Sequence, residues 1–342
     1  MWESGLQLFL VGSALYSRVV TCSLRCTTNN GTSSYQVTQL VAFEDLTITI
    51  RSLQRFLEAP YSAHNLVQSC VRRLSVEGIH LCGDDSQEGL QAPLDGQFSS
   101  QNIECCQSLN SLATLIPEMA SLHTFRLNIL IDSPSSISEE NRWSQTIITL
   151  ISSLPKSVTH LVVDNPGQSP RVSLDKTGGA GQGHLICHLL CARNFLPSLH
   201  HLRLRMRIMC PQVLKMNSSN EHPLLETMVL NLSLHEEGVN ATDQAQYCAG
   251  YGPRKAGLYL DMLGMAEDAV LEFPALRTMR ILHPKLPSLK IGSDDAVSKR
   301  RVVLPENVPW DDVDWDDEGF TDNDGHEESD VDLFDDSASE AS

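Results

Sequence analysis

A short phrase recurs along this chain: a turn residue, an apolar residue, two spacers, a second apolar residue, one spacer and a third apolar residue. It occurs at 155–163 (PKSVTHLVV), 197–204, 223–230 and 274–281, with looser copies at 70–76 and 120–127. The last two apolar positions alternate with period two, which is typical of a short strand with one buried face. A proline just before such a strand marks its beginning, because proline cannot donate to a strand ladder. Repetition of one strand type predicts stacked repeats, a class that usually binds other molecules.

Segments with helical spacing lie between these strands, at 62–70, 103–119, 144–154, 184–195 and 257–270. Such alternation favours parallel strands joined by helical crossovers. Successive phrases are 51, 36, 41, 26 and 51 residues apart, whereas regular leucine-rich repeats run about 20–29 residues. We therefore expect an α/β fold, an irregular leucine-rich-repeat-like solenoid with long inserted loops at 83–100, 132–142, 164–183 and 236–253. Two further strands are expected near 19–24 and 46–50.

The acidic residues of the chain are concentrated at its C-terminal end. The net charge is −18, yet residues 306–342 hold 16 acidic side chains and no Lys or Arg, which leaves 27 acidic and 25 basic residues elsewhere. This composition predicts two parts: a body over 1–304, with repeats clearest at 60–290, and a disordered acidic tail over 305–342. The tail contains four large aromatic residues, Trp310, Trp315, Phe320 and Phe334. Aromatic residues spaced through acidic sequence are typical of interaction segments that fold on binding.

The phrases SLPKSVTHLVVD and FLPSLHHLRLRM, with the acidic end, resemble the leucine-rich-repeat part of fungal F-box-type proteins. The resemblance covers about 60 to 290. It implies a role in presenting substrates to a ubiquitin ligase. Members of this family usually begin with an F-box, a helical module opening with a Leu-Pro-x-Glu phrase. No such phrase stands at the N-terminus here, so either the chain is a member without the module or its start lies too far downstream.

Motifs that could carry chemistry give no support for an enzyme. His184, Cys187, His188 and Cys191 share one face of an expected helix, but the outer pair lies about 10 Å apart at 1.5 Å per residue, too far to close a tetrahedral metal site. The glycine-rich run 176–184 lacks the Gly-Lys-Ser/Thr ending of a phosphate loop. No Gly-x-Ser-x-Gly or His-Glu-x-x-His motif occurs, and the carboxylates of the body are dispersed. We expect no catalytic residues, no metal and no cofactor.

The strand positions that alternate with the apolar ones point to a binding surface. They carry basic residues and threonines but no acidic side chain, and in a solenoid they line the concave face. The members are Arg73, Arg126, His160, His201, Arg203, Arg205 and Arg280, with Thr227 and Thr278. One hypothesis is that this basic strip binds an acidic protein partner; the alternative is that these residues only keep the strands soluble. A second hypothesis is that the acidic tail docks onto the strip and occludes it.

Together these features predict a non-enzymatic protein–protein interaction module, with substrate recognition in ubiquitin ligation as the role implied by the resemblance. Two alternatives stay open: an enzyme on a doubly wound α/β sheet, and a scaffold or chaperone whose acidic tail binds basic proteins. Strand order separates the first alternative from a solenoid. Nucleic-acid binding is not expected of a neutral body with an acidic end, nor is a membrane span. Ten cysteines without a disulfide rhythm favour a reducing compartment, the cytoplasm or nucleus.

Overall fold

Nine strands of the chain form one sheet in which the strand order follows the sequence. This arrangement is seen in a computed structural model, which describes residues 44–78, 98–129, 137–166, 186–187, 189–190, 198–215, 223–234, 244–248, 257–285, 290–304 and 310–311. The order is β1-β2-β3-β4-β5-β7-β9-β10-β11, and β6 and β8 form a separate small sheet. The strands are β1 (Asp45–Thr49), β2 (Arg73–Gly78), β3 (Thr124–Ile129), β4 (His160–Asn165), β5 (His201–Met206), β6 (Ile208–Met209), β7 (Thr227–Asn231), β8 (Gln246–Tyr247), β9 (Thr278–Lys285), β10 (Lys290–Asp295) and β11 (Arg301–Val303).

The seven strands from β1 to β9 in the large sheet are parallel, and they are joined by the same backbone hydrogen bonds at every junction. The carbonyl oxygen just before one strand accepts two consecutive N–H groups at the start of the next, at N···O distances between 2.8 and 3.2 Å. The accepting residues are Glu44, Arg72, His123, Thr159, His200 and Glu226. The repeated phrase therefore corresponds to a repeated structural unit, although the sequence between units varies in length.

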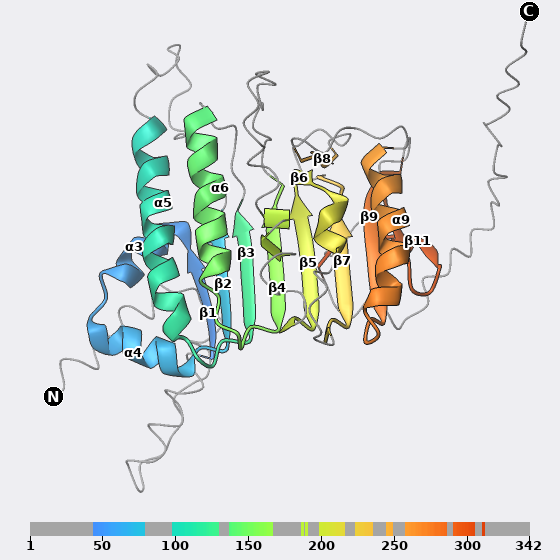
Figure 1. The fold of residues 1–342 in the computed structure, drawn as a ribbon. Helices are drawn as coiled ribbons and strands as arrows, with labels where there is room; N and C mark the ends of the chain where they lie inside the picture. The colour runs from blue at the N-terminus through green and yellow to red at the C-terminus, as the bar shows by residue number, and fades with distance from the viewer. Residues whose placement is uncertain are drawn as a thin grey trace, which may run out of the picture.

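Helices cover one face of this sheet. Figure 1 shows α5, α6 and α9 lying in front of the strands, with α3 and α4 beside β1 and β2. The helices are α3 (Ile50–Leu57), α4 (Tyr61–Cys70), α5 (Phe98–Leu115), α6 (Ile137–Ser152) and α9 (Gly257–Glu272), with 3-10 turns η1 (Ile116–Glu118) and η2 (Pro211–Leu214). Within the part of the chain that is described, no helix has the length and apolar character that crossing a membrane would require.

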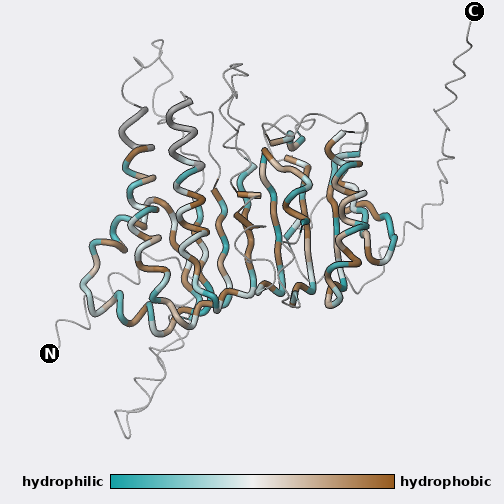
Figure 2. Tube along the Cα trace, viewed as in Figure 1, coloured by the Kyte–Doolittle hydropathy of each residue, from teal (hydrophilic) through white to brown (hydrophobic). Residues whose placement is uncertain are grey.

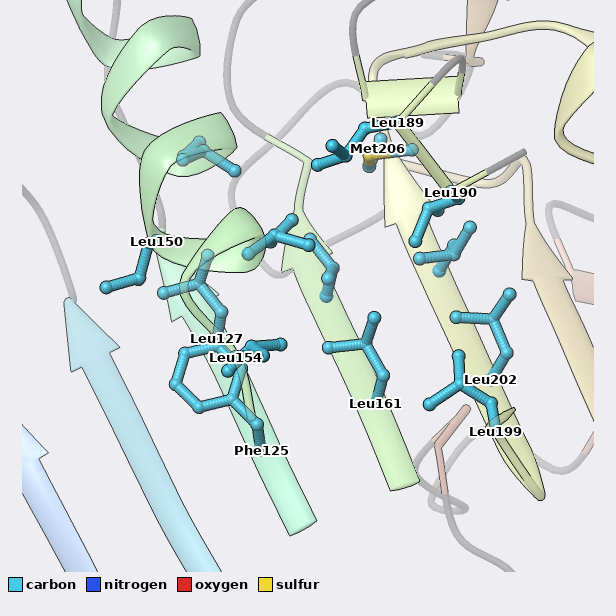
Figure 3. Packing of buried hydrophobic residues seen from close by; sticks show 14 of the residues in the cluster. Phe125, Leu127, Leu150, Leu154, Leu161, Leu189, Leu190, Leu199, Leu202 and Met206 are labelled. Carbon is cyan, nitrogen blue, oxygen red and sulfur yellow. The ribbon is translucent and has the colours of Figure 1, made fainter. Parts of the chain in front are cut away.

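The core lies between the helices and the sheet. Phe125 and Leu127 of β3, Leu161 of β4 and Leu202 of β5 are fully buried and face the helix layer (Figure 3). The first apolar position of every phrase is also buried, namely Val71, Leu122, Val158, Leu199, Leu225 and Leu276. Figure 2 shows hydrophobic and hydrophilic residues interleaved along strands and helices, as expected when each element has one buried face.

The structure confirms a mixed α/β fold with a large, mostly parallel sheet. All six phrases contain or lead into strands, and the expected helices at 62–70, 103–119, 144–154 and 257–270 fall on α4, α5 with η1, α6 and α9. Of the expected helix at 184–195, the described residues 186–187 and 189–190 are helical. The expected strand at 19–24 lies outside the described residues, and the one at 46–50 is β1.

Three features of the fold differ from the expectations. Ile50, expected to end a strand, begins α3, a helix that the sequence did not predict; Thr49 and Ser52 make a capping box at its start, in which each side chain accepts the other's backbone N–H, at 3.2 and 3.0 Å. Residues 98–100 and 137–142, assigned to loops, are the first turns of α5 and α6. The sheet ends in two antiparallel strands, β10 and β11, at its C-terminal edge, where the sequence had suggested no element.

Candidate protein interaction surface

The seven residues of the basic strip lie on the sheet face opposite the helices. In parallel strands, residues paired in register project from the same face. His160 pairs with His201, and Val162 pairs with Arg203, while Arg126 pairs with Val162 one strand away. Arg280 joins the same row through Val229 of β7. The register thus brings the predicted residues onto one surface that runs from β2 to β9.

This surface is neither uniformly basic nor uniformly exposed. The side chain of Arg73 is 60% exposed, but Arg203 and Arg205 are only 4% and 8% exposed. The same rows also contain Asp45 and Asp164, which the alternation argument had left out. The expectation of a solvent-facing strip is therefore corrected for Arg203 and Arg205, which are buried components of the face.

Carboxylates neutralise three of the strip's arginines. Asp164 accepts two hydrogen bonds from Arg205, from Nε at 2.6 Å and from Nη2 at 2.8 Å, in a buried bidentate pair. Arg73 makes a similar two-point pair with Asp45 at the exposed edge of the sheet, with Nη2 2.7 Å from Oδ2. Bidentate geometry fixes the plane of the guanidinium as well as its position. The charges of Arg205 and Arg73 are therefore held in fixed positions and compensated by neighbouring carboxylates.

The third carboxylate comes from the acidic tail. Asp311 lies with Oδ2 2.5 Å from Nη2 of Arg126 on β3, and its side chain is only 6% exposed. The residue before it, Trp310, is 7% exposed. Its Nε1 donates to Oδ2 of Asp164 at 3.4 Å, and its ring lies over the Arg205 guanidinium with 5.4 Å between Cζ and the ring centroid. Both residues belong to the segment predicted as tail, and both are packed against the sheet.

A second, smaller hydrophobic cluster surrounds Trp310 on this face. It contains Val229 of β7, Leu282 of β9 and Leu304, with Val162 and Ile291 packed at its edge. Val229, Leu282 and Val162 share the face of Arg203 and Arg205 by register. The indole thus sits on an apolar floor while its N–H and its ring face meet polar groups. An arrangement of this kind suits tryptophan, which combines a large apolar body with one polar donor.

Two histidines, the first residues of β4 and β5, form a stacked pair on the same face. The rings of His160 and His201 are 4.2 Å apart between centroids and inclined by 22°. Burial, followed by the charge of His201 and other nearby bases, lowers the pKa of His160 to about 4. Burial also lowers the pKa of His201, which outweighs the opposing effect of Glu226. At neutral pH the pair is therefore uncharged, and the positive character of the strip comes from its arginines.

A separate polar cluster lies on the helix side, at the antiparallel edge of the sheet. Asp294 of β10 is 5% exposed and accepts a short hydrogen bond from the Tyr259 hydroxyl, while His283 Nε2 and Arg301 Nε lie 3.1 Å from its oxygens. Burial opposes ionisation of Asp294, but hydrogen bonds from His283 and Tyr259 outweigh it and lower its pKa. Sequence reasoning missed this cluster, because its residues come from α9, β9, β10 and β11. We interpret it as a tie between α9 and the end of the sheet.

Of the four residues weighed as a helical metal site, the structure describes Cys187 alone. Its thiol lies beside those of Cys210 and Cys248, which the sequence did not connect with it. A hydrogen bond with Cys210 and burial raise the pKa of Cys187 to about 12. None of the six described cysteines forms a disulfide.

Comparisons with protein-family models, with curated proteins and with solved structures find no match to this chain. The assignment of a function therefore rests on the surface itself.

Proposed function

We propose that this chain is a non-enzymatic protein-interaction module whose basic strip binds an acidic peptide segment containing a tryptophan. The observation that carries the proposal is the position of Trp310 and Asp311, which occupy the strip through an apolar floor, a ring-to-guanidinium contact and an ion pair. An external segment with the same two side chains would satisfy the same groups. The chain's own tail then acts as an internal competitor for that partner.

The architecture supports a repeat protein of the leucine-rich-repeat-like kind. Solenoids place successive strands side by side in sequence order, and their exposed strand faces are the usual binding surfaces. The described strands of the large sheet follow that order, and the repeated junction hydrogen bonds give each unit the same local geometry. A doubly wound sheet would instead reverse its strand order at a crevice, and no reversal occurs among the nine described strands.

Substrate recognition for a ubiquitin ligase is the biological role that we propose for this module. The support is the resemblance of the phrases at 153–164 and 195–206 to fungal F-box-type repeat proteins. Co-purification of a ligase adaptor with the tagged chain from its own cells would support this role. Recovery of the strip's peptide partner without any ligase component would leave the binding module and remove the ligase role.

Peptide binding can be measured directly on the full chain. The probe is a fluorescent peptide with the sequence of residues 306–318, which contains Trp310-Asp311-Asp312 and the similar Trp315-Asp316-Asp317. We expect weak binding to the wild type, because the tail occupies the strip. We expect tighter binding, by on the order of tenfold or more, to the Trp310→Ala/Trp315→Ala variant, since removal of an internal competitor raises the fraction of open sites. Fluorescence anisotropy gives both affinities.

Matched controls separate this surface from general charge attraction. Arg126→Glu in the same variant should abolish binding, whereas Lys299→Ala should not, because Lys299 pairs with Glu267 of α9 on the helix side. A peptide with both tryptophans replaced by alanine should bind far more weakly. Equal binding of the peptide by the wild type and the double variant, or binding indifferent to Arg126→Glu, would contradict the proposal.

A further inference from the structure

Three cysteine thiols from distant parts of the sequence meet inside the protein. Cys187 lies in the helical residues 186–187, Cys210 follows β6 directly, and Cys248 follows β8 directly. Their sulfur atoms all lie within 4.8 Å of one another, and Sγ of Cys187 is 3.9 Å from Sγ of Cys248. The three residues are at most 1% exposed.

The small parallel sheet brings two of these thiols together. Ile208 pairs with Gln246 and Met209 with Tyr247, so the next residues in the same register are Cys210 and Cys248. The ladder continues to that point, since the N–H of Cys248 donates to the carbonyl of Met209 at 3.2 Å. Both strands therefore end at the same level, with a cysteine as the next residue of each. The third thiol is that of Cys187, in the helical residues 186–187. Leu189 and Leu190, which follow it, pack beside the end of β5 near Met206 (Figure 3).

The distances suit metal coordination better than a disulfide. A disulfide requires sulfur atoms about 2.05 Å apart, roughly half the 3.9 Å between the sulfur atoms of Cys187 and Cys248. Thiolates bound to one zinc ion at about 2.3 Å in tetrahedral geometry lie about 3.8 Å from one another, close to the Cys187–Cys248 distance. The other two sulfur–sulfur distances are at most 4.8 Å, about 1 Å above the separation expected in such a site.

We propose that Cys187, Cys210 and Cys248 bind one zinc ion. Thiolate sulfur is a preferred ligand of zinc, and a divalent ion leaves a smaller net charge on three buried thiolates than a monovalent one does. Zinc sites of this kind have four ligands in tetrahedral geometry, so the three thiols leave one coordination position for a further donor. The site goes beyond the interaction surface, because it lies at the small sheet and not on the basic strip. It joins the helical residues 186–187, the end of β6 and the end of β8, three short segments.

Burial of the three thiols sets how the metal is acquired. Binding releases protons from the thiols, and coordination adds its free energy to folding. Because no sulfur is open to solvent, zinc enters as the chain folds, and a chelator removes it slowly from the native protein but at once from the unfolded chain. Refolding without zinc should give a protein that unfolds at lower urea concentration, since a ligand bound to the native state alone stabilises it.

The test uses the full chain, purified under reducing conditions without chelator or a polyhistidine tag. Elemental mass spectrometry should find about one zinc ion per chain. Cys210→Ala should lower this content several-fold, while Cys106→Ala, which removes a buried cysteine in α5 outside the cluster, should leave it unchanged. Because Cys210→Ala could unfold the protein, the wild type is also refolded with Co²⁺ alone. Thiolate-to-cobalt charge-transfer absorption, with the visible bands of tetrahedral cobalt, is the expected result.

Three outcomes would overturn the proposal. The first is wild-type protein that holds no metal in stoichiometric amount, even after refolding with zinc. The second is zinc retained equally by Cys210→Ala and the wild type, which identifies binding elsewhere on the chain. The third is a Cys187–Cys248 disulfide, detected by non-reducing peptide mapping of protein isolated with its thiols blocked.

Discussion

The two faces of the sheet are built on opposite principles. On the helix face the same kind of residue recurs from strand to strand, as in Leu74, Phe125, Leu161 and Leu202, all at most 1% exposed. On the other face, neighbours in register differ in kind: Val162 lies next to Arg203, and Asp164 next to Arg205. Packing of one apolar row against another is not directional and tolerates change. The opposite face depends on particular pairs, and for this reason we propose it as the binding surface.

Part of that second face is closed by the chain itself. Leu304 and Trp310 cover the apolar residues between β7 and β10, and Asp311 reaches Arg126 on β3. The helix face is closed by the crossovers that also make the fold, whereas the opposite face is closed by Leu304 and by two residues of the acidic tail, Trp310 and Asp311. A contact of this second kind can be exchanged for an external segment without dismantling the core. This difference underlies the proposed competition between tail and partner.

The largest effect is expected from a cavity on the helix face. Phe125→Ala removes a fully buried ring and should lower the free energy of unfolding by about 3–5 kcal/mol. Asn128→Ala, on the same strand but on the opposite face, should change it by less than about 1 kcal/mol. Urea titration followed by circular dichroism measures both. Similar losses for the two variants would mean that the faces do not differ as described.

A comparable loss is expected when the buried ion pair of the opposite face is broken. Asp164→Leu leaves the Arg205 guanidinium buried without its carboxylate and should cost about 3–5 kcal/mol of unfolding free energy. Asp164→Leu combined with Arg205→Met replaces the pair by apolar side chains and should recover most of this loss. A double-mutant cycle from urea titrations gives the coupling energy. A single variant that loses less than about 1 kcal/mol would show that this part of the face is hydrated.

The smallest effect concerns the stacked histidines and depends on pH. The pKa of His160 is about 4 in the folded protein and near 6.5 as an ordinary histidine, so the folded state binds fewer protons. The resulting stabilisation is present above pH about 6.5 and is lost as the pH falls toward about 4. In the His160→Gln variant this part of the pH dependence should be absent, so the variant gains stability relative to the wild type as the pH falls.

Unfolding midpoints in urea at a series of pH values measure this difference. The groups facing His160 are His201, His200, His123 and Arg203, and all of them remain in the variant. Thr227→Ala, which alters the residue paired with His201 in the next strand, is the matched control and should keep the wild-type slope. An unchanged slope in His160→Gln would show that other groups account for the pH dependence.

The sequence by itself determined the units of this fold. Period-two alternation placed the buried positions of β2, β3, β4, β5, β7 and β9, and helical spacing placed α4, α5, α6 and α9, because both signals are local and are repeated many times. The same alternation assigned Arg126 and Arg280 to the face opposite the core. Neither signal predicted α3, which begins with a capping box between Thr49 and Ser52, or the first turns of α5 and α6, whose polar residues were assigned to loops.

Only the tertiary structure decided what those positions meet. The strand register sets Asp164 beside Arg205 and two cysteines at the same level of the small sheet. It also packs Trp310 against residues far earlier in the chain, such as Val229 and Asp164, the latter 146 positions before it. Contacts of this kind depend on which strands become neighbours and by how many residues they are offset. Those relations are fixed by the summed packing of the whole sheet, and no local pattern of residues encodes them.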